Sequence, residues 1–205
     1  MQATPLRPDS NKRLLVPVLI GLILVTVGYR VFSSQFDGLG NTAPLMAIAF
    51  GGALLLGPRY FWIPLVLLVL SDLALGLWNP SGGLGFYTVA SMLFYLAVAG
   101  LARSIGGSRR NLWIRFWTGT LLCSVAFYLF ANTYAWLAFP GYIHSLGGWW
   151  QAQTTGLPEF SPPAWVFLRN AILADTIWCF IAMVCYLILT RPRTPASESE
   201  AIPTS

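Results

Sequence analysis

Two aspartates lie inside long apolar stretches of this sequence, where a carboxylate is unusual. Asp72 lies in the run VLLVLSDLALGLW, and Asp175 lies in FLRNAILADTIW. An aspartate at the centre of a membrane-spanning helix costs about 2.5–3.5 kcal/mol on insertion scales, so it is rarely turned towards lipid. Such side chains instead pair inside the helix bundle or line a substrate or ion pathway. The two aspartates are therefore the first residues to consider as part of a functional site.

The composition is that of a membrane protein. Hydrophobic residues make up 56% of the 205 residues and charged residues only 9%, whereas soluble domains carry about 25% charged residues. The nine tryptophans suit anchoring at the membrane surfaces. The formal net charge is +5, but so few charges leave no basic face for a nucleic acid. We expect the lipid bilayer as a partner and exclude nucleic-acid binding.

Six apolar segments approach the length of about 20 helical residues that crosses a hydrocarbon core about 30 Å thick. They cover approximately residues 14–32, 43–57, 60–77, 84–102, 112–138 and 163–190. The alternating segments of about 9–11 residues that a membrane β-barrel needs do not occur. We therefore predict an all-α, polytopic membrane protein, with a six-transmembrane-helix bundle over residues 14–190.

The basic residues indicate how this bundle is oriented. Ten of the 12 Lys and Arg residues flank the predicted spans on one side, and Arg30 is the one placed in a loop on the other side. This positive-inside bias predicts that both termini are cytoplasmic. Residues 1–13 become a cytoplasmic N-terminal segment, and the polar residues 191–205 become a disordered cytoplasmic tail. We expect a multi-pass protein of the cell inner (cytoplasmic) membrane.

With this topology, the helical rise of about 1.5 Å per residue gives each polar side chain a depth. Asp72, Asn132 and Asp175 lie about 8, 9 and 6 Å below the outer surface. Arg169 and Asn170 lie at the rim, just above Asp175. Three helices thus place polar groups at one level of the outer leaflet. Either Arg169 neutralises an aspartate in a packing ion pair, or these groups line a polar cavity that opens outward.

The outer loop 139–162 lies directly above this level. Loops of its length are usually functional lids or disordered, and its tryptophans argue against disorder. Trp149 and Trp150 either anchor the loop at the membrane interface or, with Gln151, cover the cavity and stack on a flat ligand. His144 is the only histidine of the chain. A lone histidine predicts no metal site by itself, although it could ligate a metal carried by a ligand.

The three cysteines all fall inside predicted spans, with no CxxC motif and no histidine at ligand spacing. We interpret them as packing thiols and predict no disulfide, no metal site and no cofactor.

Small residues form a stripe on the second span. Ala43, Ala47 and Gly51 recur at positions i, i+4 and i+8, and Ala49 with Ala53 forms another such pair. Small-xxx-small patterns let helices approach closely in lipid. The stripe therefore serves either packing within the bundle or docking of another membrane protein.

Several stretches together resemble a known group of proteins. NTAPLMAIAFGGALL, PLVLLVLSDLALG, ANTYAW, the outer loop and FLRNAILAD look like an uncharacterised family of six-helix bacterial membrane proteins. That family is similar to the substrate-binding (S) components of energy-coupling-factor vitamin transporters, including solitary cobalamin-transporter-like members. The likeness covers roughly residues 38–187. Its most specific pieces are Asn41 with Pro44, Ser71 and Asp72 with Gly76, Asn132 with Trp136, and Asn170 with Asp175.

The resemblance implies a protein that takes a vitamin-sized molecule from the outer face and works with an energy-coupling membrane subunit. We therefore expect a substrate-binding and uptake protein rather than an enzyme, with no catalytic residues. The candidate ligand-binding residues are Asp72, Asn132, Asp175, Arg169, Asn170, Asn41, Trp136, Trp149, Trp150 and Gln151. Two alternatives remain open. One is a structural or accessory membrane protein without a ligand, and the other is an intramembrane aspartyl-type hydrolase, whose two carboxylates share a proton.

Overall fold

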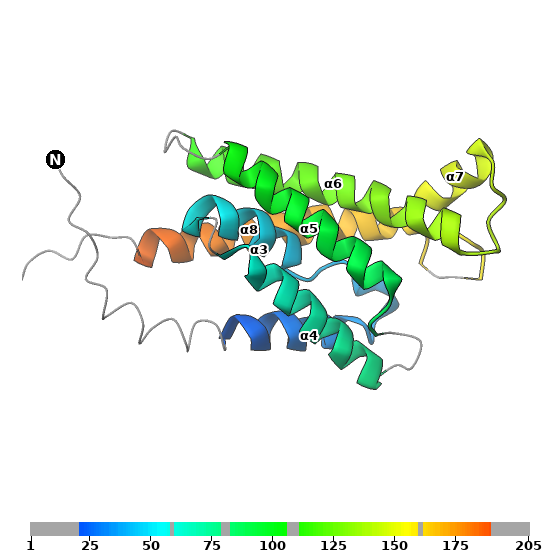
Figure 1. Cartoon of the computed structure of the whole chain (residues 1–205), viewed down its shortest axis with the longest axis horizontal. Coiled ribbons are helices and arrows are strands. Elements are labelled where there is room, and N and C mark those ends of the chain that lie inside the picture. The colour runs from blue at the N-terminus through cyan, green and yellow to red at the C-terminus, as the bar shows by residue number, and fades with distance from the viewer. Residues whose placement is uncertain (1–20, 58–59, 79–82, 106–110, 160–161, 190–205) are drawn as a thin grey trace, which may run out of the picture.

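The computed structural model describes residues 21–57, 60–78, 83–105, 111–159 and 162–189, and the regular structure in these ranges is helical (Figure 1). The elements in chain order are η1 (Leu24–Gly28), α2 (Tyr29–Ser33), η2 (Asp37–Leu39), α3 (Leu45–Gly51), η3 (Gly52–Leu56), α4 (Trp62–Trp78), α5 (Phe86–Ile105), α6 (Leu112–Ala138), α7 (Leu146–Gln153) and α8 (Ala164–Leu189). The predicted all-α fold is confirmed for these residues. The expected N-terminal segment 1–13 and tail 191–205 lie outside them.

Three of the described helices, α5, α6 and α8, are long and apolar enough to cross a membrane. Three shorter apolar helices cover Gly21–Ser33, Leu45–Leu55 and Trp62–Trp78. Each of the six overlaps one of the apolar segments seen in the sequence. The length and composition of α5, α6 and α8 are those of membrane-spanning helices.

The short helix α3 is the centre of the bundle and contacts α4, α5, α6 and α8. Its glycine lets α6 come close, because a Cβ atom on Gly51 would lie only 2.5 Å from the ring of Phe116. The reverse also holds, since a Cβ atom on Gly119 of α6 would lie 2.1 Å from the ring of Phe50. Both phenylalanines are completely buried. Each ring therefore fills the space that a side chain would need on the facing helix.

The small residues of α3 and η3 thus serve packing inside the bundle. Ala47, Ala49, Gly51 and Ala53 are all buried by other helices of the same chain. Close approach through small residues is how helices associate in lipid, where there is no hydrophobic force between them. Internal packing therefore accounts for these four residues of the stripe, whereas Ala43 is half-buried.

The two longest helices, α6 and α8, lie side by side (Figure 1). They have 27 and 26 residues, which corresponds to about 40 Å and exceeds the hydrocarbon core by about 10 Å. Helix α8 already begins at Ala164, whereas counting about 20 residues back from its end placed the outer boundary near Ala171. Asp175 lies about 16 Å along α8 from its first residue. That this helix projects beyond the membrane, and that its polar residues share one level, stay predictions.

Candidate ligand-binding site

Asp72 is buried, and an arginine from another helix neutralises it. Its side-chain Oδ1 lies 2.6 Å from Nη1 of Arg30 on α2, and its Oδ2 accepts a hydrogen bond of 2.7 Å from the hydroxyl of Thr88 on α5. Arg30 also donates to the hydroxyl oxygen of Ser71, which in turn donates to the backbone oxygen of Leu68. A buried carboxylate is stable only with such partners, because an unpaired charge away from water is costly. Three helices thus meet at this carboxylate.

The expected role of Arg169 as the cation for an aspartate is wrong. Arg169 donates to Oδ1 of Asn170 at 3.1 and 3.3 Å, and its guanidinium lies 5.5 Å from the centre of the Trp165 ring. The reason is helix packing, since α2 lies against α4, whereas α8 packs chiefly on α6. Arg30 was expected in an outer loop. It is instead part of helix α2, and its side chain reaches Asp72 directly.

Asp175 is also buried, but in a different environment. The hydroxyl of Ser124 on α6 and the carboxyl of Asp175 are hydrogen-bonded. The same hydroxyl lies 3.0 Å from the backbone oxygen of Thr120. The backbone N–H of Ala47, in the first turn of α3, donates to the carboxyl as well. No cation among the described residues forms an ion pair with Asp175.

The polar face of α5 lies beside Asp72, which Thr88 contacts. Thr88, Ser91 and Tyr95 follow one another at helical spacing and are all buried. The Tyr95 side chain interacts electrostatically with both Asp72 and Asp175. The Ser91 hydroxyl is 1% exposed and makes no hydrogen bond of good geometry with the described residues, although the Tyr87 side chain interacts with it. The charges of both aspartates therefore reach one buried tyrosine of α5.

Sequence reasoning predicted the helix α5 but missed the polar residues on its buried face. It used Arg30 only as an indicator of topology. Hydroxyl side chains are common in membrane helices, so Thr88, Ser91 and Tyr95 were not singled out. The available signal was their spacing of three and four residues, which places them on one face of a helix. For Arg30 the signal was its position at the end of an apolar span, at the height of Asp72.

Asn170 and Asn41 shape the connection between α2 and α3. Asn170 is buried and donates to the backbone oxygens of Gly38 and Gly40, at 2.7 and 3.0 Å. A Cβ atom on Gly40 would lie 2.3 Å from the ring of Phe167, so this connection sits tightly on α8. Asn41 is exposed and has φ of 61°, a left-handed conformation that asparagine adopts more readily than most residues. The described contacts of both residues are structural.

The predicted lid, loop 139–162, contains a short helix, α7, which packs on α6 near the C-terminal end of α6 (Figure 1). The helix begins at Ser145, whose side chain caps it by accepting a hydrogen bond from the N–H of Gly148. Trp149 donates from its indole N–H to the hydroxyl of Thr133 at 3.0 Å, and Gln153 donates to the same oxygen at 3.2 Å. Thr133 is therefore the main polar anchor of α7 on α6.

Trp136 and Asn132 lie on α6 beneath this loop. Trp136 donates from its indole N–H to the backbone oxygen of Ile143 at 3.0 Å. The ring of His144 packs edge-on against Trp136, and its Nε2 lies 3.1 Å from the Trp136 backbone oxygen. Asn132 donates to the backbone oxygen of Tyr128 at 3.0 Å. These contacts hold the start of the loop on α6 and do not reach either aspartate.

The remaining lid residues are held locally or are exposed. Gln151 donates to the backbone oxygen of Gly156 at 3.0 Å and so closes the turn after α7. Trp150 is 63% exposed, as expected for an anchor at the membrane interface. Burial raises the pKa of the Tyr142 phenol above its usual value, and a hydrogen bond with the backbone of Leu157 offsets part of this rise.

Comparison with known proteins places the chain in a family. The profile of a family of unknown function (DUF6580) matches residues 10–197, which is most of the sequence. The chain belongs to the DUF6580 family. It matches no curated protein and no solved structure. The expected membership of an uncharacterised family is confirmed, while the likeness to transporter S components stays a prediction.

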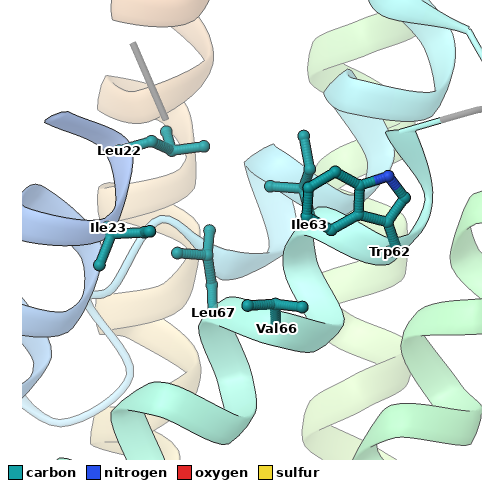
Figure 2. Close-up of a pocket in the computed structure, with 6 residues that line it drawn as sticks. All are labelled: Leu22, Ile23, Trp62, Ile63, Val66 and Leu67. Atoms are coloured by element: carbon teal, nitrogen blue, oxygen red, sulfur yellow. The ribbon is translucent and has the colours of Figure 1, made fainter. Parts of the chain in front are cut away.

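Two pockets on this DUF6580 member are lined by apolar residues. The first, of about 150 Å³, lies between the N-terminal helix and α4 (Figure 2) and is lined by Leu22, Ile23, Trp62, Ile63, Val66 and Leu67. The second, of about 360 Å³, lies between α5 and α6. Neither is lined by a residue of the predicted site. Since Asp72, Ser91 and Asp175 are all buried, the polar interior is closed to solvent in this structure.

The described residues also bear on metal and thiol chemistry. Among them there is no group of three or more His, Cys, Asp or Glu side chains that could hold a metal ion. Cys123 and Cys179 are buried, Cys185 is exposed, and all three are free thiols. Cys185 therefore differs from the expectation that every cysteine packs inside the bundle.

Proposed function

We propose that the chain crosses the cell inner (cytoplasmic) membrane six times, with both termini in the cytoplasm. Six apolar helices and the ten-to-one distribution of basic residues support this topology. Reporter fusions placed after Arg193 and within residues 145–155 test it. They should report opposite sides of the membrane, and reports from the same side would contradict the six-span topology.

We further propose that the polar interior binds a small, vitamin-like molecule that the protein takes up from the outer face. The supporting observation is the Ser91 hydroxyl, which is buried on the face of α5 that also carries Thr88 and Tyr95 and makes no hydrogen bond of good geometry with the described residues. More than about 90% of buried polar groups in proteins are hydrogen-bonded, and leaving one unpaired costs about 1–3 kcal/mol. A bound ligand would satisfy this hydroxyl.

The same interior offers further groups to such a ligand. Arg30 and Asp72 provide two opposite charges, and Tyr95 provides a buried hydroxyl that the charges of both aspartates reach. Because these groups are closed to solvent, entry requires the outer ends of the helices to separate. Helix α7 is the element that would move, since it is short and its polar contacts with α6 come from Trp149 and Gln153. An energy-coupling membrane subunit is the partner that would drive this movement.

A structural or accessory role is the second candidate. It is favoured by Asp72, whose two carboxylate oxygens are both satisfied within the bundle. The hydrolase alternative has less support. Aspartyl proteases place two carboxylates about 3 Å apart so that they share one proton, whereas Asp72 and Asp175 have separate partners and no hydrogen bond joins them.

Replacing Ser91 by alanine separates the binding role from the structural role. Small molecules that co-purify with the protein in mild detergent are identified and quantified by mass spectrometry. Loss of one hydrogen bond, worth about 0.5–1.5 kcal/mol, should reduce the retained compound about 2–13-fold. The thermal stability of the variant should be unchanged or higher, because an unpaired buried hydroxyl is removed.

Ser104→Ala is the matched control on the same helix. Ser104 is exposed, and its hydroxyl donates to the backbone oxygen of Leu101. This variant should retain the compound like the wild type. If the wild type retains no compound, or if both variants retain it equally, the interior does not bind a ligand through Ser91 and the accessory role is favoured.

A further inference from the structure

We infer that Asp175 is a buried proton-binding site, at which a neutral carboxyl group donates a hydrogen bond to Ser124 while Asp72 remains ionised. This inference goes beyond the proposed uptake function and does not depend on it. It rests on the hydrogen-bond geometry and on the charges that surround each aspartate.

The contacts of Asp72 fit an ionised carboxylate. Arg30 faces one oxygen at 2.6 Å, and the Thr88 hydroxyl lies 2.7 Å from the other. The oxygen of Thr88 accepts a hydrogen bond from the N–H of Gly85, so its single proton can be directed at Asp72. Both carboxylate oxygens therefore meet donors, and a cation balances the charge. No proton is needed on Asp72.

Asp175 differs because its hydroxyl partner has a second acceptor. The Ser124 oxygen lies 3.0 Å from the backbone oxygen of Thr120 and within hydrogen-bond distance of Oδ2 of Asp175. A hydroxyl group has only one proton to donate. When Ser124 donates that proton to the Thr120 oxygen, the Ser124 oxygen can only accept from Asp175. The hydrogen bond between Ser124 and Asp175 then requires a proton on the carboxyl group of Asp175. The Ala47 N–H is compatible with this state, since it can donate to the carbonyl oxygen of a neutral carboxyl.

The charges around the two aspartates decide between the possible proton positions. The described groups that interact with Asp175 carry no positive charge. They are the Ala47 N–H of α3, Tyr95 of α5, Cys123 and Ser124 of α6, and Cys179 of α8, the helix that carries Asp175 itself. Arg30, which also reaches this interior, is paired with Asp72. An isolated carboxylate away from water is so unfavourable that the group binds a proton instead. The neutral form of Asp175 is therefore the one that this environment accommodates.

Infrared spectroscopy of the full-length protein in lipid vesicles at neutral pH tests the protonation state. A protonated carboxyl has a carbonyl stretching band that is separate from the bands of carboxylates. The wild type should show this band, Asp175→Asn should lack it, and Asp72→Asn should keep it. A wild type without the band, or a band that is lost in Asp72→Asn and kept in Asp175→Asn, would overturn the inference.

Ser124→Ala provides a second test if the Asp175 variant does not fold. Removing the acceptor oxygen should shift the frequency of the band, because the carboxyl proton loses its partner. The exposed Ser104→Ala variant should leave the frequency unchanged. An unshifted band in Ser124→Ala would show that Asp175 does not donate to Ser124.

Discussion

Replacing Gly51 by alanine should destabilise the helix bundle, whereas the same change at its neighbour Gly52 should not. A Cβ atom at position 51 would lie 2.5 and 2.7 Å from two ring carbons of Phe116, while nothing lies within 4 Å of a Cβ atom at position 52. Phe116 is completely buried, so a shift of its ring would have to displace other side chains of a close-packed interior. The two glycines adjoin in the sequence, so the comparison isolates the contact with the ring.

The expected difference in stability between the two variants follows from two opposing contributions, helix propensity and steric crowding. Alanine is favoured over glycine in a helix by about 0.8–1.0 kcal/mol, and neighbouring positions share this gain. Inserting a methyl group into a well-packed core costs about 1–3 kcal/mol, and only Gly51 meets this cost. The free energies of unfolding of the two variants should therefore differ by about 1–3 kcal/mol. For a protein of about 200 residues this corresponds to a difference in Tm of about 2–12 °C.

Thermal unfolding in mild detergent, followed by tryptophan fluorescence at one scan rate, measures this difference. A fixed scan rate is needed because an irreversible transition shifts with the rate of heating. Adding Phe116→Leu to the Gly51→Ala variant should restore part of the lost stability, since the smaller side chain relieves the contact. Equal Tm values for the Gly51 and Gly52 variants would refute the close packing of α3 on α6.

Two further predictions concern the outer half of the bundle. Arg30→Met should lower the free energy of unfolding by about 3–5 kcal/mol, because it leaves Asp72 buried and unpaired. The double variant Arg30→Met/Asp72→Leu should be more stable than Arg30→Met in the same thermal assay. A double variant as unstable as Arg30→Met would contradict the ion pair. Gly148→Ala should release α7 from its cap, because the new Cβ atom would lie 1.9 Å from the backbone oxygen of Ile143, whereas Gly147→Ala meets only a side-chain oxygen at 3.8 Å. Limited proteolysis within residues 139–162 should be faster for the first variant alone, and equal rates would contradict the packed position of Gly148.

The sequence by itself determined the class of protein and the direction of its polar residues. Few charges and long apolar runs require a membrane, and length then requires helices, because a helix satisfies every backbone polar group within one segment. Because a carboxylate in lipid is energetically costly, the sequence alone predicted that Asp72 and Asp175 point into the bundle. The spacing of the small residues around Gly51 likewise predicted a close contact between helices.

Only the tertiary structure decided which groups meet. Helices that are apolar on every side carry no pattern that marks their neighbours, so the sequence suggested Arg169 as the cation for an aspartate and placed Arg30 only in a loop. The packing of α2 on α4 selected Arg30, and that of α6 on α8 gave Asp175 a hydroxyl in place of a cation. Ser124 and Asp175 are 51 residues apart in the chain, and Arg30 and Ser71 are 41 apart. Contacts over such separations depend on how the helices are arranged in space, because no local propensity or spacing encodes them.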